Sequence, residues 1–326
     1  MGSNDSGRLG QKHNSPVVII AGPTAAGKSA IAIELAARLD GEIVSVDSMQ
    51  VYRGMDIGTA KPSPLERERA QHHLIDILDV SEKFDAARFV SLAETALAEI
   101  RSRGKFPILC GGTGFYIKAW LEGLGEAPAT NAALRDELSR TPLEKLLLEL
   151  QEKDPVTFKR IDRQNPRRVI RAIEVIRLTG RPYSAQQADW RSSSAEAPEQ
   201  KFNVYRKKNA VCFGISWPPG ELRKRIDRRV DEMFREGLVP ETADLMKRGL
   251  TNNPNAMQAL GYRQIVEHLN GIRPLDQTVE LVKIRTRQFA KRQMTWFKRQ
   301  LRLDWLPLNE KIDAVAELTR RISAHC

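Results

Sequence analysis

The stretch VVIIAGPTAAGKS, residues 17–29, decides the fold. Its first four residues, Val17 to Ile20, form a continuous apolar run, which is typical of a buried parallel strand. Residues 22–29 match the phosphate-loop pattern G-x-x-x-x-G-K-S/T at every position. Behind the loop, apolar residues from Ile31 to Leu39 recur at helical spacing. This order predicts an α/β fold: a phosphate-loop NTPase-like parallel sheet with helices on both faces.

The loop itself predicts a site for a diphosphate or a longer polyphosphate. Glycine lets backbone N–H groups turn inward around phosphate oxygens, and the N-terminus of the next helix adds positive potential. Lys28 supplies a point charge, and the Ser29 hydroxyl is a candidate ligand of Mg²⁺. We expect the phosphate to be bound by Gly22, Pro23, Thr24, Ala25, Ala26, Gly27, Lys28 and Ser29.

The composition narrows the class of partner and the compartment. The 326 residues carry a formal net charge of +11 with a pI near 9.7, which favours an anionic partner. The three cysteines lie far apart without metal-ligand spacing, so we expect the cytoplasm, a reducing compartment, and neither disulfides nor a zinc site. No apolar run reaches the roughly 20 residues that span a membrane. Residues 1–15 are expected to form a disordered tail.

A second strand is predicted at residues 42–48, with Asp47 at its carboxyl end. In a parallel sheet this end opens on the same edge as the phosphate loop, so we expect Asp47 near the bound phosphate. Its carboxylate is a candidate either for water-mediated binding of Mg²⁺ or for a general base. Residues 49–62 are expected to form an ordered loop beside the site, and residues 74–78 a third strand.

The stretch PILCGGTGFY, residues 107–116, predicts a further buried strand that ends in GGTG before a helix. Glycine at the carboxyl end of a strand permits close approach of a ligand, and Thr113 offers a hydroxyl there. A tight strand-to-helix turn would give the same pattern. The functional interpretation gains weight because this end shares an edge with the phosphate loop and Asp47.

The pattern changes between residues 120 and 205, where charged helical sequence replaces strand-like runs. A helix at residues 167–178 follows Asn165-Pro166, a favourable helix start, and carries four arginines that form either a solvated face or a phosphate-binding one. A strand at residues 211–216 then returns the chain to the sheet. We therefore predict a phosphate-loop core in residues 16–119, a helical insertion in residues 120–205, and a return to the core with a basic helical C-terminal region in residues 206–326.

Two basic helices follow this last strand. The helix predicted at residues 221–237 places Arg225 and Arg229 four residues apart on one face, where they either reach the phosphate site or form surface ion pairs. Residues 283–303 contain eight Lys or Arg and no Asp or Glu, with aromatic residues among them. This one-sided charge favours a surface for a nucleic-acid backbone. The aromatic residues are expected to be core contacts rather than base stackers.

Six motifs together closely resemble those of the tRNA dimethylallyltransferases, also called tRNA isopentenyltransferases. They are GPTAAGKS, SVDSMQVYRGMDIGTAKP, GGTGFY, PRRVIRAIEV, AMQALGY and TRQFAKRQMTWFKR, in family order from Val17 to about Trp305. Two positions depart from the family pattern. Ala26 stands where the family often has Ser, and Phe115 stands where Leu is usual.

The resemblance implies transfer of a dimethylallyl group from its diphosphate to N6 of the adenosine just 3′ of the anticodon, with release of diphosphate. It implies Mg²⁺ as cofactor, the tRNA anticodon stem-loop and dimethylallyl diphosphate as partners, no membrane, and a monomer. Asp47 is the implied general base, Thr113 binds near the same adenine, and Lys28 with Arg225 acts on the leaving diphosphate, which Arg229 also binds. The residues implied to contact tRNA are Asp47, Ser48, Met49, Gln50, Thr113, Arg135, Arg167, Arg168, Val169, Ile170, Arg171, Gln258, Ala259, Leu260, Gly261, Tyr262 and Arg263.

Three other functions remain open from the residues. A phosphate-loop kinase of small molecules would need ATP and would leave the basic helices unexplained. A nucleotide-dependent RNA-binding module would leave Asp47 without a role at the edge of the sheet. A prenyltransferase acting on free adenine nucleotides is the nearest alternative, and the long basic helical parts favour tRNA over it.

Overall fold

The computed structural model describes residues 15–125, 128, 130–186, 208–309 and 312–324, so all but residue 15 of the predicted tail lies outside the described residues. The chain forms two compact units. Unit 1 contains residues 1–121 and 199–326, and unit 2 contains residues 122–198. Among the described residues, no helix is long and apolar enough to cross a membrane.

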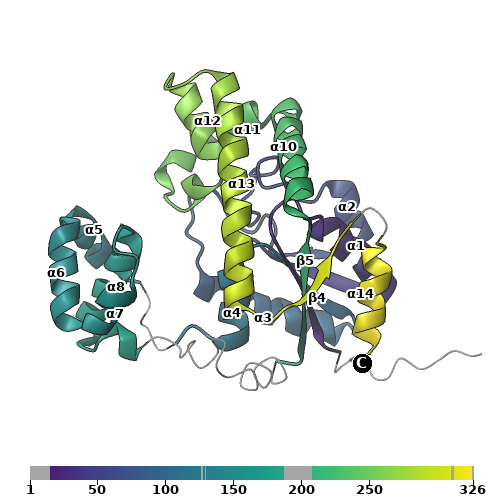
Figure 1. The fold of residues 1–326 in the computed structure, drawn as a ribbon, viewed down its shortest axis with the longest axis horizontal. Helices are drawn as coiled ribbons and strands as arrows, with labels where there is room; N and C mark the ends of the chain where they lie inside the picture. Colours follow the sequence, from purple (N-terminus) through teal and green to yellow (C-terminus); the bar gives the residue numbers. More distant parts are fainter. Residues whose placement is uncertain (1–14, 126–127, 129, 187–207, 310–311, 325–326) are drawn as a thin grey trace, which may run out of the picture. The chain divides into compact units, whose positions relative to one another are not determined.

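Unit 1 is built on a six-stranded parallel sheet with the strand order β3-β2-β4-β1-β5-β6. Strand β1 is central, where β4 pairs with it on one side and β5 on the other. In Figure 1, strands β4 and β5 of this sheet lie to the right of the long helix α13. The strands are β1 (Val17–Ala21), β2 (Gly41–Val46), β3 (His72–His73), β4 (Phe106–Gly111), β5 (Ala210–Ser216) and β6 (Asp304–Pro307). The predicted α/β parallel sheet is confirmed.

Helices cover the sheet on both faces. Side chains of a strand alternate between faces; Val18 and Ile20 pack in one cluster with Leu35 and Leu318, while Val17 and Ile19, which point the other way, are equally buried. The helices of unit 1 are α1 (Lys28–Leu39), α2 (Pro64–Arg69), α3 (Ala86–Ser102), α4 (Gly114–Glu122), whose last residue belongs to unit 2, α10 (Pro219–Glu236), α11 (Leu238–Lys247), α12 (Tyr262–Leu269), α13 (Leu275–Gln300) and α14 (Ala314–Ser323), with short 3₁₀ turns at Leu250–Asn252 and Ala256–Gln258.

The strand predicted at residues 74–78 is wrong, because β3 contains only His72 and His73. Leu74 and Asp76 adopt positive φ angles of 62° and 55°, which interrupt an extended strand. The carboxylate of Asp76 instead accepts hydrogen bonds from Lys61 at 2.5 Å and Arg67 at 2.8 Å. These ion pairs fix the turn at the edge of the sheet and also hold residue 61 of the predicted loop.

Unit 2 is entirely helical in its described part. It contains α5 (Ala132–Arg140), α6 (Leu143–Lys153), α7 (Pro155–Arg160), α8 (Pro166–Thr179) and a 3₁₀ turn at Tyr183–Ala185. Its apolar core includes Leu138, Leu146, Leu150 and Ile173. The fully buried carboxylate of Glu174 accepts hydrogen bonds from the Asn131 backbone N–H, Arg135 and Arg171. Helices α5 and α8 are therefore joined at one buried charge.

Candidate active site

The phosphate loop, residues 22–27, is held open by partners that bind its carbonyl oxygens. Arg225 Nε donates to Ala25 O at 3.0 Å, and Trp217 Nε1 donates to Ala26 O at 3.1 Å. The Arg225 guanidinium also lies 4.5 Å from the centre of the Trp217 ring. Two loop N–H groups are already bound within the protein, that of Thr24 to Gln293 and that of Ala26 to Pro23 O. Because Arg225 and Trp217 hold these carbonyls, the other N–H groups of the loop remain for an anion at the start of α1. The loop conformation itself needs Gly27, whose φ is +86°.

Two cationic side chains, Lys28 and Arg229, lie at this anion site with little negative charge near them. Lys28 Nζ donates to Pro23 O at 2.7 Å, and burial lowers the pKa of Lys28 to about 8. Burial likewise lowers the pKa of Arg229, while Asp47 acts in the opposite direction. Among the described residues, the side chain of Arg229 forms no hydrogen bond or ion pair. Cations that repel each other in a partly dry site are stabilised by an anionic ligand. Arg229 therefore belongs to the site as directly as Arg225 does.

Asp47 follows β2, and its side chain is fixed by hydrogen bonds from the backbone of the turn that comes after it. Its Oδ1 accepts the backbone N–H of Met49 at 2.8 Å and of Gln50 at 3.3 Å. Thr113, which follows β4, accepts the N–H of Ser48 at 3.2 Å with its Oγ1 and donates its own N–H to Val46 O at 3.2 Å. The ends of β2 and β4 are thus hydrogen-bonded to each other, and the two predicted polar side chains lie at one edge, as expected.

One residue at this edge, Gln293 of α13, was missed by the sequence reasoning. Its Oε1 accepts the N–H of Thr24 at 2.9 Å, and its Nε2 donates to Gly112 O at 2.9 Å. The sequence signal was only a glutamine within a basic helix. Among the aromatic residues of the same helix, Phe297 is buried and Trp296 packs on Gly114, as predicted. The prediction of a core contact is wrong for Phe289, which is exposed.

The predicted loop at residues 49–62 is ordered by buried polar contacts. Gln50 bonds to Ser45 and to two backbone carbonyls of the loop, and Lys61 Nζ donates to Tyr52 O at 2.8 Å. Glu241 of α11 accepts the N–H groups of residues 56, 57 and 58. The hydroxyl of Tyr262 donates to the same carboxylate at 2.6 Å. This loop is therefore tied to α11 and α12, which the sequence did not indicate.

Several residues implied to contact tRNA are buried, which corrects those predictions for their side chains. Val169 is fully buried in the core of unit 2, and Tyr262 and Ala259 are buried in unit 1. Arg135 and Arg171 are oriented by Glu174, and Ile170 packs against the same core. Gln258, Arg263, Arg167 and Arg168 are exposed, while Ser48, Met49, and Leu260 are partly exposed and Gln50 and Gly261 are buried.

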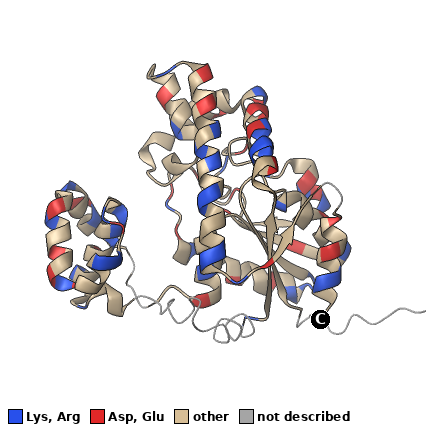
Figure 2. Ribbon diagram, in the orientation of Figure 1, with Lys and Arg blue, Asp and Glu red and all other residues tan. Residues whose placement is uncertain are grey.

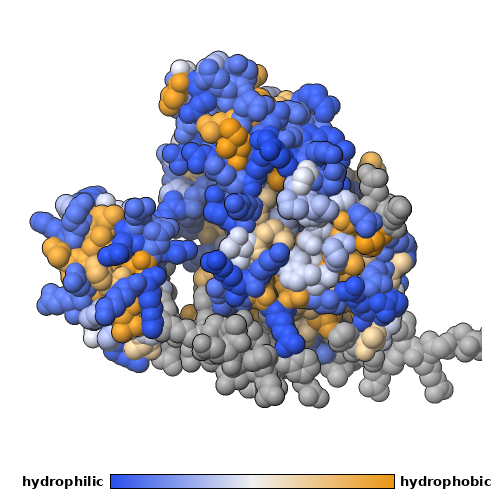
Figure 3. Space-filling view, in the orientation of Figure 1, coloured by the Kyte–Doolittle hydropathy of each residue, from blue (hydrophilic) through white to orange (hydrophobic). Residues whose placement is uncertain are grey.

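The outer face of α13 is strongly cationic. Figure 2 shows Lys and Arg residues along this helix, with few Asp or Glu residues among them in its C-terminal half. Figure 3 shows that the side chains over this helix are mainly hydrophilic. A hollow of about 500 Å³ on this face is lined by Lys291, Arg292, Trp296 and Arg299 among others. Cations around an aromatic ring provide the contacts that an RNA strand uses.

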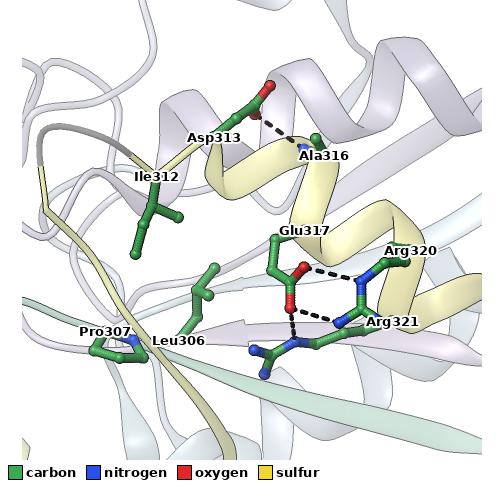
Figure 4. A pocket seen from close by; sticks show the side chains of 8 residues that line it. All are labelled: Leu306, Pro307, Ile312, Asp313, Ala316, Glu317, Arg320 and Arg321. Atoms are coloured by element: carbon green, nitrogen blue, oxygen red, sulfur yellow. Dashed lines mark hydrogen bonds and ion pairs between the residues drawn. The ribbon is translucent and has the colours of Figure 1, made fainter.

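A second hollow, also of about 500 Å³, lies between β6 and α14 and has a different character. Figure 4 shows Ile312 above Leu306 and the carboxylate of Glu317 between Arg320 and Arg321. Both arginines donate to Glu317, and Arg321 also pairs with Asp304, so the two positive charges are locally compensated. This hollow offers no uncompensated cation for a phosphate, in contrast to the edge beside the phosphate loop.

The described residues contain no cluster of three or more His, Cys, Asp or Glu that could hold a metal ion alone. Ser29 is exposed at the start of α1 beside Lys28. A Mg²⁺ ion commonly takes one or two protein oxygens and completes its shell with phosphate oxygens and water. The donor set therefore fits Mg²⁺ brought in with a diphosphate and does not fit a resident metal cluster.

Comparisons with known proteins agree with the motifs. The profile of the family described as IPP transferase matches residues 50–300. A tRNA dimethylallyltransferase of Geobacter metallireducens is 45% identical over 309 residues, 94% of this chain and 96% of that protein. A crystal structure of a tRNA isopentenylpyrophosphate transferase from Bacillus halodurans superposes with a TM-score of 0.67 and 37% identity, covering 95% and 96% of the two chains. A eukaryotic dimethylallyltransferase acting on tRNA gives a TM-score of 0.73 at 28% identity, over 94% of this chain and 77% of that one.

Proposed function

The chain belongs to the tRNA dimethylallyltransferase family and is a tRNA prenyltransferase, and on that premise we propose how its residues divide the reaction between them. The reaction transfers a dimethylallyl group from dimethylallyl diphosphate to N6 of the adenosine 3′ of the anticodon and releases diphosphate. The observation that carries the proposal is the placement of Asp47 and the phosphate loop at one edge of the sheet. Family membership favours this function over a phosphate-loop kinase and over prenylation of free adenine nucleotides.

The phosphate loop binds the diphosphate of the donor. Loop N–H groups, Lys28, Arg225 and Arg229 surround the position of the anion. Charge builds on the leaving oxygens as the bond from carbon to oxygen breaks, and fixed cations stabilise that charge. Mg²⁺, which Ser29 would hold through its hydroxyl, supplies further neutralisation of the leaving group when bound.

Asp47 removes the proton from the attacking amine. The exocyclic nitrogen of adenine is a weak nucleophile, and its acidity rises as it bonds to carbon, so a base is needed at that moment. The turn with Met49 and Gln50 engages Oδ1 of Asp47, and among the described residues Oδ2 accepts no hydrogen bond. Thr113 lies beside Ser48 and is suited to bind the same adenine. The adenosine must leave its stack to reach this edge.

The tRNA contacts are proposed for cations of each unit, taken separately. In unit 1 these are Arg263 and the α13 face with Lys291, Arg292 and Arg299, and in unit 2 Arg167 and Arg168. Backbone phosphates bind such cations in a salt-dependent way, and the anticodon stem-loop is the proposed partner. We also propose that the protein acts as a monomer in the cytoplasm.

A transfer assay tests the proposal. Dimethylallyl diphosphate labelled in the prenyl group is given with Mg²⁺ and unmodified tRNA, with free AMP in a parallel reaction. We expect label in tRNA, at the adenosine 3′ of the anticodon, and none in AMP. Label in AMP alone would contradict the tRNA assignment, and ATP hydrolysis without any labelled product would support a kinase-like enzyme. A tRNA with guanosine at the target position is the matched control.

A further inference from the structure

The side chain of Gln293 connects two loops that are far apart in sequence. It comes from the middle of α13, is only 9% exposed, and bonds to the phosphate loop at Thr24 and to the β4 loop at Gly112. The partners lie 269 and 181 positions away in the chain. A buried side chain with both polar atoms paired to backbone groups is an ordered connection.

The amide group is chemically suited to this place. One partner is an N–H donor and the other a carbonyl acceptor, so the bridging group must accept at one end and donate at the other, as a carboxamide does. The amide group of Gln293 also packs closely against Gly112. A Cβ atom on Gly112 would lie 2.7 Å from Nε2 of Gln293, so the glycine leaves room for the bridge.

The bridge joins the two halves of the proposed reaction. Thr24 belongs to the loop that holds the diphosphate, and Gly112 precedes Thr113, whose hydroxyl binds the Ser48 N–H next to Asp47. A continuous set of hydrogen bonds therefore runs from the donor loop through Gln293 to the end of β2 that carries the base.

We propose that Gln293 is a positioning residue that fixes the spacing between the donor and acceptor subsites, an inference that rests on the proposed function. When the spacing is lost, the allylic carbon and the adenine amine are misaligned while the diphosphate remains bound. Water then competes for the carbon. Its oxygen forms the new bond to carbon, the bond from carbon to the diphosphate oxygen breaks, and a proton goes to solvent, which gives dimethylallyl alcohol and diphosphate.

The test compares diphosphate release with tRNA prenylation in the same reaction. Gln293→Met keeps the length of the side chain and removes both hydrogen bonds, and Gln277→Met, at an exposed position near the start of the same helix, is the matched control. Gly112→Ala displaces the amide from the opposite side and serves as a second variant. In the wild type and in Gln277→Met we expect about one diphosphate per prenylated tRNA.

For Gln293→Met and Gly112→Ala we expect the ratio of diphosphate to prenylated tRNA to rise at least about threefold, and kcat for transfer to fall about 10- to 100-fold, because small misplacements are costly to rate. KM for each substrate should change less than kcat. A ratio that stays near one in both variants would overturn the inference, whether or not activity and melting temperature decline together, because that is the behaviour of a purely structural residue. A wild type that prenylates no tRNA would instead overturn the proposed function, and the inference with it.

Discussion

Replacing Asp47 with asparagine should remove the base and keep the turn that positions it. The Asn side-chain oxygen can still accept the N–H groups of Met49 and Gln50, which Asp47 Oδ1 now accepts at 2.8 and 3.3 Å. The amide nitrogen that replaces Oδ2 cannot take a proton from the amine. A positioned general base contributes about 10²- to 10⁴-fold. We therefore expect the rate of transfer to fall by that factor, or about 3–5 kcal/mol in barrier height.

Diphosphate binding should respond in the opposite direction. The carboxylate of Asp47 interacts electrostatically with Lys28 and Arg229, and its negative charge opposes a bound anion. Removing this charge should leave the Kd for diphosphate unchanged or lower it. A slower reaction with equal or tighter diphosphate binding is a pattern that general loss of structure does not produce.

Two measurements decide the matter. Single-turnover transfer with enzyme in excess over labelled donor gives the chemical rate, and calorimetric titration with diphosphate and Mg²⁺ gives the Kd. Asp79→Asn, at a mostly exposed position of unit 1, is the control and should behave as wild type. A transfer rate for Asp47→Asn within about threefold of wild type would remove Asp47 as the base. Weaker diphosphate binding in parallel with a slower rate would indicate a disordered site instead.

Three further predictions concern charge and packing. Because the pKa of Lys28 is about 8, Lys28 loses its positive charge as the pH rises through 8, and diphosphate should bind more weakly. Titrations at each pH should show an affinity about tenfold lower at pH 9 than at pH 7, relative to the Lys28→Arg variant, which stays charged. Glu174→Gln should destabilise unit 2 by about 2–3 kcal/mol, because two arginines lose their buried carboxylate partner. The control variant Glu137→Gln, at an exposed position, should destabilise it by under about 1 kcal/mol, and hydrogen exchange of α8 measures both effects. In Gly114→Ala, Cβ would lie 2.3 Å from the Trp296 ring, so denaturant unfolding should show a loss of about 1–3 kcal/mol; an unchanged midpoint would contradict this packing.

The sequence predicted the functional edge of the sheet well because the residues at this edge lie next to strands in the sequence. Val17–Ala21 and the loop that follows it form one continuous signal. Asp47 follows β2 directly, and Thr113 follows β4 after one residue. Parallel topology then places strand ends together without any knowledge of side-chain contacts. The false strand at residues 74–78 has the opposite cause. The apolar residues there do follow a strand-like pattern. The ion pairs of Asp76 with Lys61 and Arg67 nevertheless stabilise a turn, and no local pattern encodes these pairs.

Long-range polar contacts were beyond the sequence. Gln293 and Glu241 each bind backbone groups of loops that lie far away in the chain, and only the folded packing of α13 and α11 brings them there. Glu174 shows the same limit, because a single acid in a basic helix gives no sign that it is buried. Motif positions on helices also mislead when a side chain faces the core, as Val169 does.

The order of the strands fits the dimensions of the reaction. Strand β4 lies between β1 and β2, so the phosphate loop and Asp47 are separated by two strand spacings, about 10 Å. An amine at about 3 Å from the base and about 3 Å from the reacting carbon, with two single bonds onward to phosphorus, requires roughly 9 Å in line. Adjacent strands would give about 5 Å, too little for an adenine amine between base and donor. The intervening strand ends at Gly111, where a Cβ atom would clash with Val46 O, so the glycine lets β4 lie close against the end of β2 that carries Asp47.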